Sequence, residues 1–211
     1  MLRDRFAKLL WGQFRKPSGV FGRIIGNDMA RGNEYAARWT VSLLDIQPES
    51  RVLEIGFGPG VAIRYASEKA TKGIVVGIDH SQTMVQAALR RNAEAIRAGR
   101  IELKQGDVSC LPYPDESFHK VFSIHSIYFW ARPADGLREL RRVLKTGGLL
   151  AITIEPKDQW TKLQRRQTSV LTLYSGTDLA AMISSAGFRN AEVEGCPEQD
   201  KFAGQCVLGV K

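Results

Sequence analysis

The sequence predicts an α/β fold in which a doubly wound, mostly parallel sheet carries helices on both faces. Two observations lead to this prediction. A stretch of buried-strand character runs directly into a glycine-rich turn at residues 52–60, and from residue 51 onward strand and helix patterns alternate. Such alternation indicates a parallel sheet, because parallel neighbours are joined by crossover helices.

The expected elements follow in order. A helix at residues 33–44 precedes the sheet and stops before Pro48. Short apolar runs bounded by turn residues predict strands at residues 51–55, 73–78, 101–104, 121–124, 149–154, 191–194 and 205–210. Helical periodicity predicts helices at residues 61–68, 84–98, 135–143 and 177–185. Ser81 is the expected N-cap of the second of these, and Gly187 is expected to close the last.

The N-terminal residues form a basic segment. Residues 2–14 read as an amphipathic helix with leucines and Phe6 on one face and basic side chains opposite. Residues 1–26 hold six basic residues and one acidic residue, a net +5 of the chain's total of +8. The helix either packs on the domain as a lid or contacts an anionic membrane surface. We therefore treat residues 1–32 as an N-terminal segment and residues 33–211 as the domain.

Composition limits the classes of protein. The 211 residues suffice for one domain, and a composition of 44% hydrophobic and 25% charged residues is that of a globular protein. No apolar run reaches the roughly 20 residues of a membrane span, and no secretory signal is recognised. Three cysteines without metal-ligand spacing (Cys110, Cys196 and Cys206) indicate free thiols. The expected location is cytoplasmic, peripheral to the inner membrane surface if the N-terminal helix binds lipid, and no metal is expected.

The glycine turn predicts a nucleotide-like ligand. Dinucleotide-binding proteins use the spacing G-x-G-x-x-G, which would require glycine where Val61 stands. Here the third glycine is Gly60, and the acidic residue Glu54 precedes the first glycine by two positions. Asp79 ends the second strand, where a carboxylate suits the hydroxyls of a ribose. These features fit an adenosine-containing ligand and argue against an NAD-dependent oxidoreductase without excluding it.

The stretch after the third strand adds a further motif. Gly106-Asp107-Val108 and Leu111-Pro112-Tyr113-Pro114-Asp115-Glu116-Ser117-Phe118 follow that strand. Together with the E-x-G-x-G-x-G turn and Asp79, this chain resembles the class I S-adenosylmethionine-dependent methyltransferases, and within them the type 11 group related to quinone-biosynthesis C-methyltransferases. The resemblance implies a Rossmann-like, seven-stranded sheet with its last strand antiparallel. His119 departs from the family's usual acid after Ser-Phe, and we expect a surface or strand-start role for it.

The resemblance assigns cofactor contacts by position. Gly56, Gly58 and Gly60 would let the backbone approach the methionine and ribose moieties of S-adenosylmethionine, and Glu54 would lie near the methionine amino group. The remaining implied contacts, with ribose, adenine or the methionine carboxylate, are Asp79, His80, Asp107, Val108 and Ser123. With lower weight, Tyr35 is expected to close over the cofactor.

Candidates for acceptor chemistry follow the fourth strand. His125 and Tyr128 are the candidate catalytic residues, because His125 can take a proton near neutral pH and both follow a strand end that faces substrate in doubly wound proteins. His125 could equally hydrogen-bond the cofactor carboxylate or a nearby loop. Tyr128, Phe129 and Trp130 either line an apolar acceptor pocket or belong to the core.

The predicted activity is methyl transfer from S-adenosylmethionine to O, N or C of a small-molecule or lipid-like acceptor, leaving S-adenosylhomocysteine. The alternative is a non-catalytic, membrane-associated cofactor-binding module. A nucleic-acid acceptor is disfavoured, because the segment Ser126-Ile127-Tyr128-Phe129 lacks the Asp/Asn-Pro-Pro-aromatic motif of amino-methylating DNA enzymes.

Overall fold

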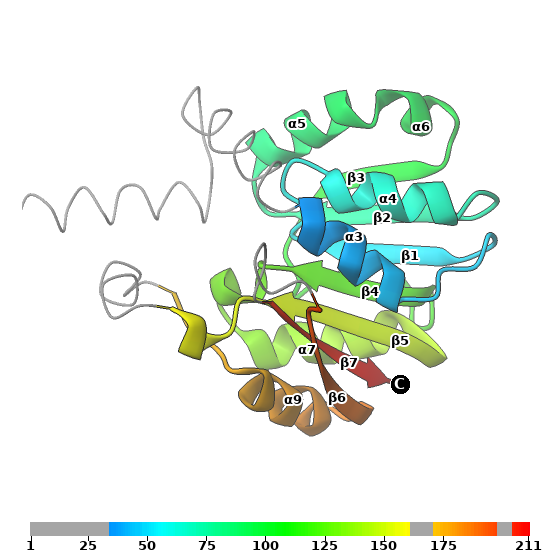
Figure 1. The fold of residues 1–211 in the computed structure, drawn as a ribbon. Helices are drawn as coiled ribbons and strands as arrows, with labels where there is room; N and C mark the ends of the chain where they lie inside the picture. Colours follow the sequence, from blue (N-terminus) through cyan, green and yellow to red (C-terminus); the bar gives the residue numbers. More distant parts are fainter. Residues whose placement is uncertain (1–33, 161–170, 198–203) are drawn as a thin grey trace, which may run out of the picture.

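A computed structural model describes residues 34–160, 171–197 and 204–211, and within them a seven-stranded sheet of order β3-β2-β1-β4-β5-β7-β6 (Figure 1). Its strands are β1 (Arg51–Ile55), β2 (Ile74–Asp79), β3 (Ile101–Gln105), β4 (Phe118–Ile124), β5 (Leu144–Ile154), β6 (Arg189–Gly195) and β7 (Gln205–Val210). All pairs among the first five strands are parallel, and β7 runs antiparallel to both β5 and β6. The predicted fold class is confirmed.

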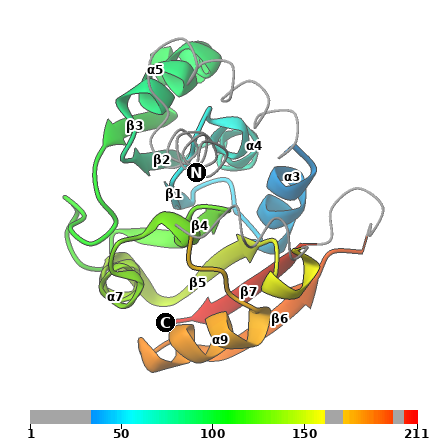
Figure 2. The same ribbon diagram turned by 90° about the vertical axis from the view of Figure 1, so that its left-hand side faces the viewer.

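Helices cover both faces of the sheet (Figure 2). One side carries α3 (Glu34–Leu43), α4 (Val61–Lys69) and α5 (Gln82–Arg91), with the short α6 (Ala93–Arg97) after them. The other side carries α7 (Pro133–Val143) and α9 (Gly176–Ser185). The two 3₁₀ turns are η1 (Ile127–Phe129) and η2 (Lys157–Gln159).

Two hydrophobic cores result from the alternation of side chains along each strand. Val52 of β1 packs in the core beneath α3 and α4, whereas the next residue, Leu53, packs in the core beneath α7 and α9. Both side chains are fully buried. Because successive strand residues point to opposite faces, a sheet covered on both sides needs apolar residues at nearly every position. This explains the continuous apolar runs of the central strands.

The structure corrects several element boundaries. The helix predicted for residues 84–98 is two helices that meet at Asn92, whose side chain donates to the carbonyl oxygens of Ala88 and Gly60. Strand β4 begins at Phe118 rather than at residue 121, because the fully buried Phe118 already pairs with Leu144 of β5. Strand β5 begins at Leu144 rather than at residue 149, and residues 145–148 form an irregularity inside it, since pairing resumes at Leu149.

Caps explain where two other helices begin. Ser81 caps α5 as predicted, with its hydroxyl accepting from the Met84 amide. Helix α9 begins one residue before the predicted start, because Ser175 and Asp178 form a capping box. The side chain of each residue accepts a hydrogen bond from the backbone amide of the other.

The N-terminal expectations lie outside the described residues. These are the helix at residues 2–14 and the segment of residues 1–32, so both stay predictions, as does the division of the chain at residue 33. Within the ranges that the structure describes, no helix has the length and apolar character needed to cross a membrane.

Candidate cofactor and acceptor site

A cavity of about 170 Å³ opens at the carboxyl ends of the parallel strands. Its walls come from the turn after β1, the ends of β2 and β4, the loop after β3, and η1. Parallel strands bring their carboxyl ends to one edge, which is where doubly wound proteins bind ligands. Of the sequence-predicted residues, the cavity is lined by Glu54, Gly56, Gly58, Asp79, His80, Asp107, Val108 and His125.

The glycine turn needs glycine for two separate reasons. Gly56, Gly58 and Gly60 all have positive φ angles, of 70°, 51° and 77°, which strain residues with a side chain. A Cβ on Gly56 would also stand 2.3 Å from the Cβ of Ser126, so the turn packs directly on the segment after β4. The Arg91 guanidinium, at the end of α5, donates to the Pro59 carbonyl over 2.9 Å and fixes the turn from the other side.

Asp79 joins the glycine turn to the start of α5. One carboxylate oxygen accepts from the Gly58 amide and the other from the Ser81 amide, each over 2.8 Å. The His80 ring lies with its Nδ1 3.7 Å from the same carboxylate, although 43% of its side chain is exposed. Burial raises the pKa of Asp79, while the two amide bonds and His80 oppose that rise. The Asp79 side chain therefore fixes the glycine turn and also lines the cavity.

Glu54 is a buried acid with one carboxyl oxygen that makes no hydrogen bond to the described residues. It is 2% exposed, and its Oε2 has no hydrogen-bond partner among the described residues. Burial, and then the nearby Asp79, raise the pKa of Glu54 well above its usual range, against a backbone hydrogen bond from Ile63. Leaving a carboxyl oxygen unpaired in the interior costs roughly 1–3 kcal/mol, so its position calls for a polar partner from outside the chain.

The loop after β3 supplies the opposite wall. The Oδ1 of Asp107 accepts from the amide and from the hydroxyl of Ser109, over 2.8 and 2.6 Å, which lowers the pKa of Asp107. Val108 is 8% exposed and belongs both to the cavity wall and to the core beneath α7. The loop thus presents one acid and one apolar side chain to the cavity.

An arginine clamp holds this loop, and the sequence reasoning did not find it. Arg142 of α7 donates to the carbonyl oxygens of Leu111 and Tyr113 and pairs with Asp115 and Glu139. These bonds raise the pKa of Arg142, the pairing with Glu139 most of all. In the sequence Arg142 looks like one of several basic residues on a solvated helix face, so composition gave no signal for this role.

Two serines connect the glycine turn to the segment after β4. Ser126 donates to the Ile55 carbonyl over 3.1 Å and shares a 2.5 Å bond with the hydroxyl of Ser123. The indole N–H of Trp130 also donates to Ser126, over 3.2 Å. Ser123 is fully buried and does not line the cavity, whereas Ser126 does.

His125 lies at the end of β4 in a left-handed conformation, with φ of 53°. Its amide donates to the Thr153 carbonyl of β5, and its ring stacks on Tyr128 at 6.4 Å. Burial lowers the pKa of His125 to about 4, so the imidazole is neutral at pH 7. A strained backbone at a non-glycine residue that lines a cavity is typical of functional sites.

Tyr128 and Tyr35 are not among the residues that line this cavity, and their roles stay predictions. The Tyr128 hydroxyl donates to the Glu155 carbonyl over 3.0 Å and accepts from the Glu155 amide over 2.6 Å. It therefore ties η1 to the end of β5, and burial raises its pKa. Tyr35 stands in the first turn of α3, from which Ala37 is the residue that reaches the cavity.

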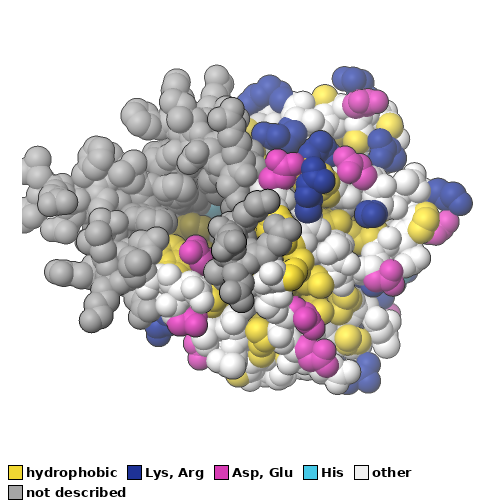
Figure 3. All heavy atoms as spheres, in the orientation of Figure 1, with side chains coloured by type: hydrophobic (Ala, Val, Ile, Leu, Met, Phe, Trp, Pro, Cys, Tyr) yellow, Lys and Arg dark blue, Asp and Glu magenta, His cyan; other side chains and the backbone are white. Residues whose placement is uncertain are grey.

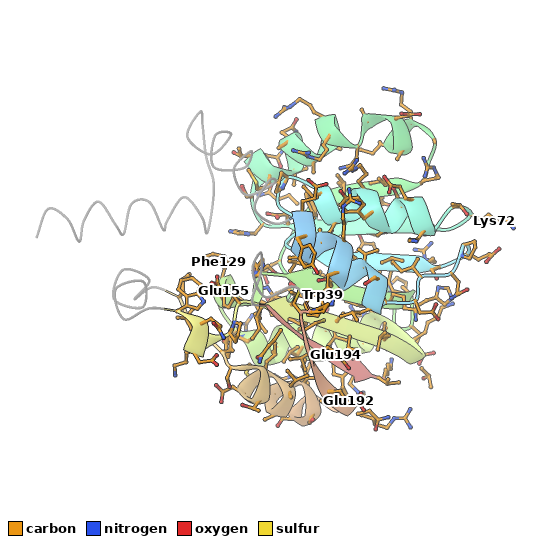
Figure 4. All side chains as sticks on the ribbon, in the orientation of Figure 1. Trp39, Lys72, Phe129, Glu155, Glu192 and Glu194 are labelled. Carbon is orange, nitrogen blue, oxygen red and sulfur yellow. The ribbon has the colours of Figure 1, made fainter. Side chains whose placement is uncertain are left out.

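The cavity is acidic although the chain is basic. Its charged lining side chains are the carboxyl groups of Glu54, Asp79 and Asp107, and none of the lining residues in the described part is Lys or Arg. Phe129 and Trp130 give the end near β4 an apolar wall, and Figure 4 shows Phe129 at the end of the molecule where the parallel strands end. These groups fit a cationic ligand with an aromatic or ribose part.

Comparison with known proteins identifies the family. The methyltransferase domain family Methyltransf_11 matches residues 53–152. The chain is 28% identical over 171 residues to the "Uncharacterized methyltransferase YdaC" of Bacillus subtilis, which covers 81% of this chain and 89% of the relative. It is 33% identical over 129 residues to the ubiquinone/menaquinone biosynthesis C-methyltransferase UbiE of Ectopseudomonas mendocina, covering 60% of this chain and 50% of the relative. Residues 53–152 are therefore a methyltransferase domain, and this match covers just under half of the chain.

A solved structure shares the fold of this methyltransferase. The S-adenosylmethionine-dependent methyltransferase of Aquifex aeolicus superposes with a TM-score of 0.69 at 22% identity, over 82% of this chain and 88% of that one. The methyltransferase spans about half the length of the UbiE relatives it matches. Its cofactor is S-adenosylmethionine, as predicted, and the acidic cavity fits the cofactor's ammonium and sulfonium charges.

Proposed function

We propose that this methyltransferase transfers the methyl group of S-adenosylmethionine to a small-molecule or lipid-like acceptor that is neutral or cationic. The observation that carries the proposal is the Oε2 of Glu54, which has no partner among the described residues, in a cavity whose charged lining side chains in the same part of the chain are carboxylates. Such a cavity attracts a cation and repels a carboxylate or phosphate. The substrate class therefore follows from the charge of the site and not from the charge of the chain.

Each wall of the cavity has a part in holding the cofactor. Glu54 would accept from the ammonium group of the methionine moiety, which its unpaired oxygen suits. Asp79, at the end of β2, would accept from the ribose hydroxyls, with His80 beside the adenine. Asp107 would accept from the adenine amine, and Val108 would pack on the ring. Asp107 can do so because both of its bonds to Ser109 use Oδ1.

The acceptor would enter on the side of the cavity that η1 forms. His125, Phe129 and Trp130 supply this side, and the indole of Trp130 is fixed by its bond to Ser126. Aromatic walls bury apolar surface at about 25 cal/mol per Å², which favours an acceptor with an apolar body. The sulfonium supplies the activated methyl group, so the chain's task is to orient the acceptor and exclude water.

His125 is better suited to orienting an acceptor than to removing its proton. Its pKa of about 4 lies some six units below that of a phenol, a gap worth about 8 kcal/mol in proton transfer. A neutral imidazole still accepts a hydrogen bond from a hydroxyl or an amine. Tyr128 has the role of a positioning residue, because its hydroxyl is engaged by the backbone at the end of β5.

A nucleic-acid acceptor gains no support from the described face that carries α3, α4, α5 and α6. Lys and Arg side chains are interspersed with Asp and Glu over the face formed by α3, α4, α5 and α6 (Figure 3). A phosphate backbone is tracked by a continuous basic stripe, and mixed charges do not make one. This supports a small or lipid-like acceptor.

Contact with an anionic membrane through residues 2–16 stays a prediction. Co-sedimentation of the whole chain with anionic vesicles, compared with a chain lacking residues 1–16, tests it. Loss of pelleting in the shortened chain is expected, and equal pelleting of the two would remove the idea.

The proposed function is tested in two steps. Calorimetry should show binding of S-adenosylmethionine and S-adenosylhomocysteine that Asp79→Asn weakens about 10- to 100-fold, because the loss of charge-assisted bonds loosens the turn. Asp158→Asn, on an exposed residue, is the matched control. Incubation of the chain with radiolabelled cofactor and an extract split into lipid, aqueous and macromolecular fractions then locates the acceptor. Label in the macromolecular fraction alone would refute the acceptor class, and binding without transfer to any fraction would indicate a non-catalytic module.

A further inference from the structure

A second hollow lies at the opposite end of the sheet from the cofactor cavity. It has a volume of about 310 Å³ and lies where β1 and β4 begin and where β5 is interrupted. Its lining includes Glu49, His119, Lys120, Lys145 and the glycines of the interruption. Figure 4 shows Lys72, the ion-pair partner of Glu49, at this end of the molecule.

Two hydrogen-bond donors face each other in the hollow. The Nδ1 of His119 accepts from the Arg51 amide over 2.9 Å, so in the neutral ring the proton must be on Nε2. The ammonium of Lys145 lies 3.0 Å from that Nε2. An ammonium has donors and no acceptor, so neither group satisfies the other. The pair lacks an acceptor between or beside the two nitrogens.

Positive charge around His119 is not balanced locally. Burial first, and then the charges of Lys145, Arg51 and Lys120, lower the pKa of His119. Lys120 is itself half-buried, and no ion pair is found for its ammonium within the described ranges, although Asp45 favours its charged form.

The carboxylates of this region are engaged elsewhere. Glu49 pairs with Lys72 over 3.4 Å. Glu116 accepts from the Thr146 hydroxyl over 2.7 Å and lies 3.4 Å from the Lys211 ammonium. Neither of them therefore supplies the acceptor that His119 and Lys145 lack.

A local irregularity of the sheet creates this arrangement. Phe118 pairs with Leu144 and Lys120 with Leu149, so one residue of β4 stands opposite four residues of β5. Irregularities of this kind re-aim side chains and are common beside functional sites. His119 is the one residue of β4 that stands opposite this interruption, and its imidazole meets the Lys145 ammonium there.

We propose that this hollow binds a small oxyanion of the phosphate type. One oxygen would accept from the Nε2 proton of His119 and from Lys145, and Lys120 would contribute charge from the adjoining position. Charge-assisted bonds of this kind are the strong ones, although exposure to solvent makes the site sensitive to salt. The proposal does not depend on the methyl-transfer activity, because the hollow is at the other end of the sheet.

The test follows His119 by NMR in the whole chain. The pKa of His119 should rise by about one unit when sodium phosphate replaces sodium chloride at equal ionic strength. The two other histidines, His80 and His125, serve as internal controls in the same spectrum. No rise at His119, or an equal rise at all three histidines, would overturn the proposal.

Two variants decide whether the named groups make the site. Lys145→Gln removes one donor and should abolish the phosphate-dependent rise in the pKa of His119, whereas Lys104→Gln, at a lysine paired with Glu102, should leave it unchanged. His119→Asp places a negative charge beside Lys145 and should abolish the increase in melting temperature that phosphate gives the unchanged chain. Calorimetry with S-adenosylhomocysteine shows that each variant is folded. A phosphate response that survives in either Lys145→Gln or His119→Asp would refute the site.

A vesicle experiment distinguishes a lipid headgroup from a soluble phosphate as the source of the oxyanion. Vesicles of phosphatidylcholine with phosphatidylglycerol are pelleted with the unchanged chain and with Lys145→Gln. If pelleting depends on Lys145 and phosphate competes, the oxyanion is a lipid headgroup. If pelleting is equal while the NMR response to phosphate holds, it is a soluble phosphate.

Discussion

Replacing Glu54 by glutamine tests the electrostatics of the cofactor site. In the free protein, burial and then Asp79 raise the pKa of Glu54 well above its usual range, so this carboxyl keeps its proton to a higher pH than an exposed glutamate does. An ammonium ligand favours the charged carboxylate, so the proton is released on binding. Below the folded pKa the affinity for S-adenosylhomocysteine should therefore rise by up to tenfold per pH unit, and above it the affinity should level off.

The expected magnitudes follow from the burial of this side chain. A buried hydrogen bond between charged groups contributes about 1.5–3 kcal/mol, so Glu54→Gln should weaken binding about 10- to 100-fold at pH 8 and flatten the pH profile. Calorimetry in two buffers of different ionisation enthalpy measures the released proton directly. Glu68→Gln, at an exposed position of α4, is the matched control. Equal proton release from Glu54→Gln and from the unchanged chain would refute the reasoning.

The same substitution has a signed effect on stability. A carboxyl whose folded pKa exceeds its unfolded value of 4.5 favours folding when protonated, and this contribution is lost as pH rises through the folded pKa. Each unit of difference corresponds to about 1.4 kcal/mol. The free energy of unfolding of Glu54→Gln should therefore exceed that of the unchanged chain increasingly as pH rises above 4.5, as urea titrations would show. Parallel pH profiles for the two proteins would contradict a raised pKa.

Four further substitutions test the contacts around the cavity. His125→Asn keeps a residue that tolerates a left-handed backbone and can accept a hydrogen bond, so its kcat should fall less than that of His125→Ala; equal losses would favour proton transfer. Tyr128→Phe leaves a buried amide without its acceptor and should cost about 1–3 kcal/mol in urea unfolding while cofactor affinity stays within about twofold; a large affinity loss would contradict a purely positioning role. Arg142→Lys cannot reproduce the forked hydrogen bonds of arginine, so the loop after β3 should loosen and the Kd for S-adenosylhomocysteine should rise about tenfold. An unchanged Kd in calorimetry would show that this loop keeps its conformation without Arg142. Gly56→Ala should lower the free energy of unfolding by more than about 1 kcal/mol. Adding Ser126→Gly should recover the loss caused by the steric clash but not the loss caused by the positive φ angle. Full recovery of stability in thermal unfolding would show that the positive φ angle does not matter.

Local patterns in the sequence were sufficient for the fold and for the cofactor. Strands of the parallel sheet are buried on both faces, so their apolar runs stand out, and the strand at residues 51–55 was predicted to the residue. The glycine turn and Asp79 are contiguous or nearly so, and their chemistry depends on backbone conformation that glycine itself signals. The family and its methyl donor could therefore be named before any coordinates.

Boundaries and helix breaks depended on contacts that the sequence does not display. The break at Asn92 exists because its side chain bonds to Gly60, which lies 32 residues away. Phe118 begins β4 because it pairs with Leu144, and no local pattern reports such pairing. These are tertiary effects that override helical periodicity and strand propensity.

The sequence by itself determined the sheet and the glycine turn, because each rests on local periodicity or on backbone geometry set by residue type, and the resemblance of its ordered motifs to a known family implied the methyl donor. Only the tertiary structure decided which polar groups are engaged and which are not. It assigned the Tyr128 hydroxyl to the backbone of Glu155, left one oxygen of Glu54 unpaired, and set the imidazole of His119 against Lys145. The physical reason is that hydrogen-bond satisfaction and burial are properties of neighbours in space, and those neighbours come from distant parts of the chain.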